Sequence, residues 1–197
     1  MALAEPPEPV QAAPAGEPAG ERELVERARR GDQRAFAALA ARHEDRAYAV
    51  ALRITRSPAE AAEAAQEALV DAWRALPGFR GEAAFGTWLH RVVARRALDR
   101  AEAQARRRGR EVAAAVAADH PAEPPAARDG VAARRLARLM AALSPAQRAA
   151  VTLYYLEEQP VEAVAAALGL PENTVKTHLH RARAALREAW GREAIEP

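Results

Sequence analysis

VEAVAAALGLPENTVKTHLHRARAAL, residues 161–186, is the most informative stretch of the chain. Its first part has apolar side chains at helical spacing, namely Val161, Val164, Ala165 and Leu168. Gly169 then favours a turn, and Pro171 suits a first helical position. After it, apolar residues recur at intervals of four, three and four, at Val175, Leu179, Ala182 and Leu186. The spacing predicts a helix, a tight turn and a second helix with one buried stripe.

The side of the second helix opposite this stripe is polar and basic. At about 100° per residue, it carries Asn173, Thr177, His180 and Ala184, flanked by Thr174, Lys176, Arg181 and Arg187. Such side chains supply donors for base edges and cations for phosphates. The pattern predicts a helix-turn-helix that reads duplex DNA. The alternative is an ordinary solvated amphipathic helix that follows a chance glycine turn.

The composition indicates small helical domains and a segregated charge. The chain has 197 residues and is 50% hydrophobic, but alanine supplies much of that fraction and buries little area per residue. The net charge is only +2, yet residues 86–110 hold eight arginines against two acidic residues, whereas residues 1–20 hold three glutamates and no cation. A binder of polyanions requires such clustering of positive charge.

The residue types that are absent exclude several classes of protein. Zero cysteines exclude disulfides, thiol nucleophiles and cysteine-based zinc sites, and permit a reducing compartment. The N-terminus lacks the basic start and apolar core of a signal peptide, and no run approaches the roughly 18 apolar residues of a membrane span. We expect a cytoplasmic protein without membrane insertion.

The chain divides into four parts. Residues 1–20 are rich in Pro, Ala, Gly and Glu and are expected to be a disordered tail. Residues 21–108 and 133–191 have helical patterns, and residues 109–132, with three prolines and few large apolar residues, look like a flexible linker. Three helix starts are expected, with an N-cap at Asp32 and capping boxes at Ser57–Glu60 and Ser144–Gln147. We therefore predict an all-α fold of two small helical domains.

No motif for catalysis is visible. The sequence has no phosphate-cradling glycine loop, HExxH, GxSxG or dinucleotide fingerprint. His178 and His180 diverge by about 200° on a helix and cannot chelate one ion together. The remaining histidines, His43, His90 and His120, are isolated and receive no role. We expect neither an enzyme nor a metal or other cofactor.

A row of carboxylates follows one face of a helix that begins near residue 58. Glu60, Glu63, Glu67 and Asp71 fall at i, i+3, i+7 and i+11, opposite a face of alanine and leucine. We expect them to line an open helix surface with nothing to desolvate them, which argues against a catalytic pair. Two interpretations remain open, a solvated face and a docking stripe for a basic partner.

Aromatic residues cluster in FRGEAAFGTW, residues 79–88, directly before the most basic helix. Aromatic rings beside arginines can stack unpaired bases and hold the phosphates of a single strand. Alternatively, the aromatics form the core of a small helical domain, which we favour for Phe79 and Phe85. Trp88 and the arginines remain candidates for nucleic-acid contacts.

Three segments together resemble bacterial RNA polymerase sigma factors of the extracytoplasmic-function (ECF) group of the sigma-70 family. They are AEAAEAAQEALVDAWRAL (59–76), FRGEAAFGTWLHRVVARRALD (79–99) and LSPAQRAAVTLYYLEEQPVEAVAAALGLPENTVKTHLHRARAAL (143–186). The resemblance covers most of residues 21–191. It implies a region 2 domain, a region 4 domain and a protein that binds core RNA polymerase, recognises the −35 and −10 promoter elements and promotes DNA melting. It also allows an anti-sigma factor as a partner.

The resemblance assigns a role to each candidate residue. Those implied to contact the clamp helices of the largest polymerase subunit are Glu63, Gln66, Glu67 and Asp71. Those implied to lie near the −10 element and its melted strand are Arg80, Trp88, Arg91, Arg95 and Arg96. Those implied to lie in the major groove of the −35 element are Asn173, Thr174, Lys176, Thr177, His180 and Arg181.

The chain departs from the family pattern in two places. It has Arg95 where the family usually has Asn, and it has Glu158 and Pro160 where the family often has Gly and Ser. The second departure is compatible with a helix start, since proline suits one. A conventional helix-turn-helix repressor or activator is the rival interpretation, but it leaves the carboxylate row and the aromatic block unexplained.

Overall fold

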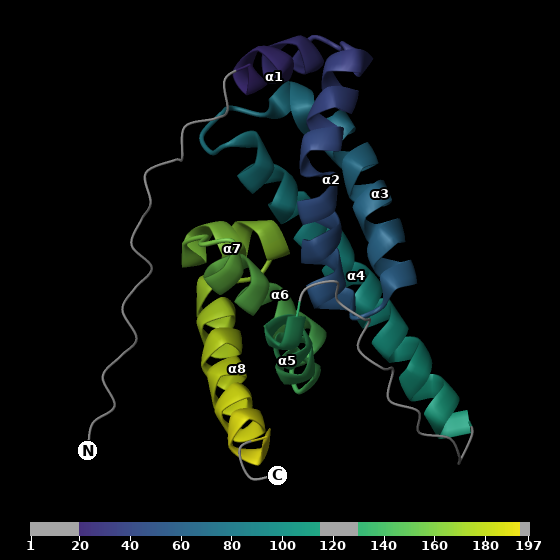
Figure 1. Ribbon diagram of the computed structural model, residues 1–197, viewed down its shortest axis with the longest axis vertical. Helices are drawn as coiled ribbons and strands as arrows, with labels where there is room; N and C mark the ends of the chain where they lie inside the picture. Colours follow the sequence, from purple (N-terminus) through teal and green to yellow (C-terminus); the bar gives the residue numbers. More distant parts are fainter. Residues whose placement is uncertain (1–19, 115–129, 194–197) are drawn as a thin grey trace.

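The computed structural model describes residues 20–114 and 130–193, and within these ranges every regular element is helical (Figure 1). The first four helices are α1 (Glu21–Arg29), α2 (Gln33–Thr55), α3 (Pro58–Ala75) and α4 (Phe85–Ala114), with a short 3-10 helix η1 (Leu76–Gly78) after α3. The last four are α5 (Gly130–Ala141), α6 (Pro145–Val151), α7 (Val161–Leu168) and α8 (Glu172–Glu193), with a π-helical turn η2 (Thr152–Leu156) after α6. The expected all-α fold is confirmed.

The boundaries differ from the expected ones at the linker. α4 continues to Ala114 and α5 begins at Gly130, so helix extends into both ends of the predicted linker, residues 109–132. Its centre, residues 115–129, lies outside the described residues, as does the predicted tail except for Gly20. In the part of the chain that the structure describes, no helix is long and apolar enough to cross a membrane.

The first bundle packs largely through alanine. Figure 1 shows α2, α3 and α4 side by side, with α1 across one end. The buried alanines of these three helices include Ala47, Ala51, Ala61, Ala64, Ala68, Ala72, Ala94 and Ala97. Leu39, Ile54, Phe85 and Leu89 fill the remaining volume and are fully buried. Because each alanine buries little apolar area, the core of this bundle buries a modest area for its number of residues, as the composition indicates.

Two of the three expected helix starts form as predicted. The Asp32 carboxylate accepts hydrogen bonds from the backbone N–H groups of residues 34 and 35. Ser144 and Gln147 form both halves of a capping box. At the third start, the Ser57 hydroxyl accepts from the Glu60 N–H, but the Glu60 carboxylate bonds to Arg100 at 2.8 Å. The predicted box at Ser57 is therefore only half formed, because a cation from α4 attracts the carboxylate more strongly than a backbone N–H does.

α7 and α8 form the predicted helix-turn-helix. α7 ends at Gly169, whose φ of 64° and ψ of 36° lie in the left-handed region that glycine adopts without a steric penalty. α8 begins at Glu172, so Pro171 lies just before the helix rather than at its first position as we predicted. Val175, Leu179 and Ala182 are buried, and the fourth residue of the predicted stripe, Leu186, is half-buried.

Helices α6 and α7 pack against α2 and α4, and the segment between η2 and α7 takes part in this contact. The Glu157 N–H donates to the Thr152 carbonyl at 3.0 Å, which closes the wide π turn, and Glu158 follows with a φ of 51°. This backbone directs the Glu157 side chain, 4% exposed, toward α2 and α4. There its carboxylate lies 2.9 Å from His90 Nδ1 and 3.2 Å from Arg46 Nε.

Gly169→Ala is expected to destabilise the protein by about 1 kcal/mol, because an L residue is strained in the left-handed region. A Cβ at this position would also lie 2.9 Å from an Arg95 guanidinium nitrogen. The free energy of unfolding in urea measures the effect. Gly191→Ala is the matched control, since Gly191 lies in α8 with nothing within 4 Å of its would-be Cβ. The control should leave stability unchanged or raise it, and a fall of the same size in both variants would contradict the assigned strain.

The carboxylate of Glu157 is expected to make stability depend on pH. Burial raises the pKa of Glu157, but the hydrogen bond and charge of His90 and the charge of Arg46 outweigh it and hold the pKa below its ordinary value of 4.5. Arg53, 4.0 Å away, is the other cation that faces it. A lowered pKa stabilises the folded state above the unfolded value, and this contribution is lost as pH falls through the folded value.

Glu157→Gln should therefore lower the free energy of unfolding by about 3 kcal/mol at pH 7, the typical cost of breaking a buried pair. The difference from the native protein should shrink as pH falls below the ordinary carboxylate pKa of 4.5. Urea titrations at several pH values measure it. Glu158→Gln removes the same charge from an exposed neighbour and should show neither effect. A difference that did not change with pH would rule out the charged pair.

Candidate functional site

The outer face of α8 presents the polar residues expected to read DNA. Asn173, Lys176, Thr177, His180 and Arg181 are exposed. Val175 and Leu179, on the opposite side, are buried against the other helices of the second domain. The Lys176 ammonium lies 3.9 Å from the Glu172 carboxylate one turn earlier, but its side chain remains 60% exposed. The buried stripe thus fixes the orientation of α8, and its polar face remains accessible to a ligand.

Two of the α8 candidates are more constrained than the sequence indicates. Thr174 is half-buried and lies at the edge of the face. The Thr177 hydroxyl donates to the Asn173 carbonyl at 2.8 Å, so its methyl group is the part that remains for an apolar contact. A threonine methyl can contact the methyl group of thymine in the major groove.

The expectation that nothing packs against the carboxylates of α3 is wrong, although Glu63 and Glu67 are exposed. Arg100 of α4 lies among three of them, with its Nε 2.8 Å from Glu60, another nitrogen 2.9 Å from Glu67, and a third bonded to Glu63. Arg96, one turn earlier, bonds to Asp71 with its Nε at 2.9 Å. The two helices are therefore joined by a row of ion pairs, and the hydrogen bond to Asp71, together with its charge, raises the pKa of Arg96.

The paired carboxylates still reach the surface to different degrees. The side chain of Glu63 is 60% exposed and that of Glu67 is 46% exposed, whereas Asp71 is 30% exposed. Gln66 is exposed between them, and Val70, one turn later, is 48% exposed, which is high for a large apolar residue. The outer surface of α3 therefore combines partly neutralised acids with an amide and an apolar side chain.

The aromatic block forms one packed cluster. Phe85 is fully buried and Phe79 is 6% exposed, which confirms the favoured interpretation of both phenylalanines as core residues. The Trp88 ring is half-buried, with its centroid 5.0 Å from that of Phe79 and 5.7 Å from that of Phe85. Arg80, by contrast, is 84% exposed and lies 3.8 Å from Glu82. The Trp88 ring thus packs against two core phenylalanines and remains partly accessible to solvent.

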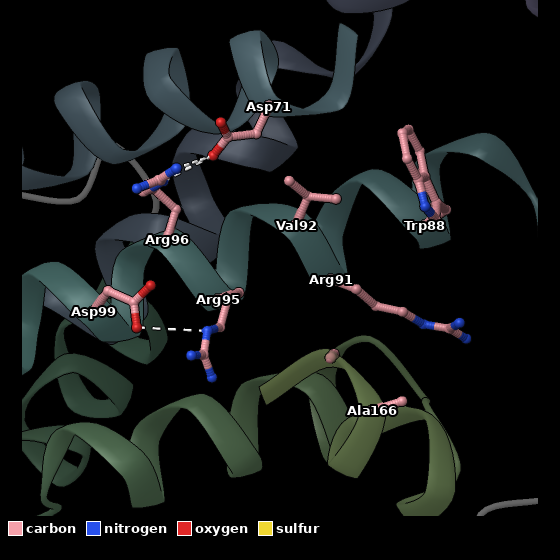
Figure 2. Close-up of a pocket in the computed structure, with 9 residues that line it drawn as sticks. Asp71, Trp88, Arg91, Val92, Arg95, Arg96, Asp99 and Ala166 are labelled. Atoms are coloured by element: carbon pink, nitrogen blue, oxygen red, sulfur yellow. Dashed lines mark hydrogen bonds and ion pairs between the residues drawn. The ribbon is translucent and has the colours of Figure 1, made fainter. Parts of the chain in front are cut away.

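A cleft of about 430 Å³ lies between α4 and α7, and the candidate residues that line it all belong to the first domain. Figure 2 shows Trp88, Arg91 and Arg95 along one wall, with Ala166 of α7 on the other. Both arginines bond to the second domain. Arg91 Nε donates to the Gln159 side-chain oxygen at 2.9 Å, and Arg95 donates to the Leu168 carbonyl. Burial against that domain lowers the pKa of Arg91.

Sequence reasoning missed four residues that organise these surfaces, namely Arg100, Arg148, Glu157 and Gln159. The spacing of Arg100 shows that it shares a face with Arg96, one helical turn earlier, but not which helix that face meets. The other three bond to residues of the other domain, and no spacing along the chain indicates those contacts. Within residues 20–114 and 130–193, no group of three His, Asp or Glu side chains is placed to hold a metal ion.

Comparison with known proteins matches both domains to described families. Residues 39–107 match the model of sigma-70 region 2, and residues 133–186 match that of sigma-70 region 4. The RNA polymerase sigma-H factor of Pseudomonas aeruginosa is 33% identical over 86% of this chain and 93% of its own length. The ECF RNA polymerase sigma-E factor of Escherichia coli K12 is 32% identical over 83% of this chain and 90% of its own.

Solved structures show the same fold. CnrH, solved in complex with the cytosolic domain of CnrY, superposes with a TM-score of 0.58 at 26% identity, over 87% of this chain and 97% of that one. The sigma factor RpoE of Bartonella quintana, solved with the anti-sigma factor NepR, gives a TM-score of 0.55 at 24% identity. The match covers 82% of this chain and 98% of that one. Matches to both domains, in this order and over most of each relative's length, lead to one conclusion. The chain belongs to the sigma-70 family of RNA polymerase sigma factors, in its ECF group, whose members act in transcription initiation.

Proposed function

We propose that this sigma factor directs core RNA polymerase to a bipartite promoter, with α8 in the major groove of the −35 element and the start of α4 beside the melted −10 strand. The observation that carries the proposal is the exposed polar face of α8, which lies opposite a buried stripe. A recognition helix needs this arrangement, because the buried side fixes the angle at which the other side enters the groove.

The upstream contacts divide by chemistry. Lys176 and Arg181 are exposed cations suited to phosphates or guanine edges. Asn173 and His180 lie on the same face and offer donors and acceptors for base edges. Thr174, at the edge, fits a phosphate contact. We assign sequence readout to the centre of the face and positioning to its borders.

The downstream contacts depend on Trp88 and the arginines around it. The indole rests on Phe79 and Phe85, so it can stack against an unpaired base without losing much side-chain entropy. Arg80 is exposed and can reach a phosphate, whereas Arg96 is held by Asp71. Arg95 replaces the asparagine usual in the family, so the preferred −10 sequence is proposed to differ from that of relatives that carry asparagine.

Core polymerase is proposed to dock on the outer surface of α3, against the clamp helices of its largest subunit. Glu63, Gln66 and Glu67 supply polar contacts, and the exposed Val70 supplies an apolar one. Asp71 contributes mainly through Arg96, which it holds. Because CnrH was solved with the cytosolic domain of another protein, we also propose that an anti-sigma factor binds this chain.

Lys176→Ala and Arg181→Ala are expected to weaken binding of the reconstituted holoenzyme to a promoter selected from random duplexes. A lost phosphate contact should reduce the slope of log affinity against log salt by about one unit, and a lost base contact should cost about 1 to 3 kcal/mol at one promoter position. Fluorescence anisotropy at several salt concentrations measures both. Arg34→Ala removes the same charge from an exposed site on α2 and is the control. If neither variant differed from this control, α8 would not be the reader.

Val70→Asp is expected to reduce affinity for purified core polymerase about tenfold, since truncating or charging one interface anchor typically costs 1 kcal/mol or more. This variant avoids the ion pairs between α3 and α4, which charge reversal at Glu63, Glu67 or Asp71 would break. Titration of labelled protein with core polymerase measures the affinity. Ala37→Asp, at an exposed site of α2, should have no effect. Equal affinity in all three proteins would remove α3 from the docking surface.

A further inference from the structure

A buried carboxylate lies at the start of α1. Glu21, the first residue of this helix, is 2% exposed, and one of its carboxylate oxygens lies 3.4 Å from Nε2 of His43 on α2. A buried carboxylate is costly without a polar partner, so this contact ties the two side chains together. Helix α1 packs against α2 and η1 and thereby keeps Glu21 beside the imidazole (Figure 1). Glu21 therefore orients the His43 ring.

The His43 ring also lies against the first turn of α4. A Cβ added at Gly86 would lie 2.7 Å from Cε1 and 2.9 Å from Nδ1 of His43, so only glycine allows the ring to approach this closely. The ring centroid is 5.4 Å from that of Phe85, which is fully buried, and 6.3 Å from that of His90, one turn later on α4. The imidazole thus sets how closely the start of α4 approaches α2.

The same turn of α4 carries Trp88. The Trp88 N–H donates to the Ala84 carbonyl at 3.0 Å, which closes the turn that contains Phe85 and Gly86. Because this turn is one hydrogen-bonded unit, a shift of Gly86 moves Trp88 as well. The indole is half-buried, so a small shift changes how much of it faces solvent. The contact between His43 and Gly86 is therefore transmitted to Trp88.

Packing alone does not account for the residue types at this contact. Within residues 20–114 and 130–193, His43 Nε2 is buried without an aligned hydrogen bond. An apolar pair of similar volume is often as stable as a buried ion pair, and glycine lowers the stability of a helix relative to alanine. Glu21, His43 and Gly86 are thus not the residues that would make this contact most stable. Their fit to one another indicates a requirement for position.

We propose that His43, oriented by Glu21, is a positioning residue for Trp88, and that it sets the angle at which the indole meets the melted strand. The effect on the strand rests on the proposed function, whereas the placement of Trp88 by His43 does not. Helix α1 thereby takes part in promoter opening through Glu21, without a DNA contact of its own. Fluorescence of the free protein tests the placement, and promoter opening by holoenzyme tests the effect on the strand.

Fluorescence of the full chain reports on Trp88 once the other two tryptophans are removed by Trp73→Phe and Trp190→Phe. In this background, His43→Ala should shift the emission to longer wavelength and increase quenching by acrylamide, because a released turn exposes more of the indole. The helical circular dichroism should stay unchanged. Arg42→Ala, at an exposed neighbouring site of α2, is the matched control and should have the emission of the background protein.

Two milder changes test the same contact if His43→Ala lowers helicity. Glu21→Gln keeps the side-chain volume and removes the charge, so it should shift the emission in the same direction, whereas Glu23→Gln, at an exposed site of α1, should not. Gly86→Ala should destabilise the protein less when His43→Ala has removed the clashing ring. Unchanged emission in both His43→Ala and Glu21→Gln, with retained helicity, would overturn the placement.

Holoenzyme reconstituted with core polymerase tests the effect on the strand. A fluorescent base analogue in the −10 element of the selected promoter reports the equilibrium between paired and open DNA. Trp88→Ala should lower the equilibrium constant for opening about tenfold, the scale of one lost base-stacking contact. His43→Ala should lower it in the same direction, with unchanged affinity for core polymerase. Added to Trp88→Ala, it should have no further effect, because it acts through the indole.

The pattern of losses distinguishes this proposal from the function on which it rests. If Trp88→Ala reduces opening and His43→Ala does not, the positioning role in opening is wrong. Additive losses in the double variant would overturn it too, since His43 would then act by another route. If Trp88→Ala itself leaves opening unchanged, the proposed role of Trp88 at the strand fails. The placement of the indole by His43 is decided in every case by its fluorescence.

Discussion

The arginines of α4 organise both domains, because they fall in two rows about 100° apart on one helix. Arg96 and Arg100 face α3 and bond to its carboxylates. Arg91 and Arg95 face the second domain and bond to Gln159 and to the end of α7. Without the first row, four carboxylates of α3 would repel one another along one face. The second row adds polar bonds to the apolar packing of α7 against α4.

The features that are determined by residues close together in the chain were predictable from the sequence. The helix-turn-helix follows from a periodic stripe and a glycine, and the structure places Gly169 in the left-handed region as the turn requires. Asp32 and Ser144 begin their helices as expected, because a capping side chain contacts only the next few residues. The core role of Phe79 and Phe85 followed from their local density in a chain with few aromatics.

The contacts between distant segments were not predictable. The charge row of α3 was visible in the sequence, but its partner Arg100 lies 40 residues after Glu60, and charge pattern alone does not indicate which helices are neighbours. Similarly, Glu157 and Gln159 resembled ordinary polar residues before a helix. Their roles arise from the packing of the second domain against α2 and α4. The roles of the α8 face and of the outer surface of α3 remain predictions, since they require a ligand or a partner.

The segment before α7 links backbone conformation to this domain contact. Glu158 has a φ of 51°, where glycine, the residue frequent at this place in the family, has no steric penalty and glutamate costs about 1 to 2 kcal/mol. The neighbours on each side fix this conformation. The Gln159 N–H donates to the Leu153 carbonyl at 2.9 Å, and the Gln159 side chain donates to the Glu157 carbonyl at 2.7 Å.

A strained residue persists only when the surrounding contacts determine its conformation. Here those contacts include the bonds of Glu157 and Gln159 to the first domain. Without the bonds to His90 and Arg91, fewer contacts would hold the left-handed turn at Glu158. The packing of the two domains and the geometry of the turn at the start of α7 therefore stabilise each other.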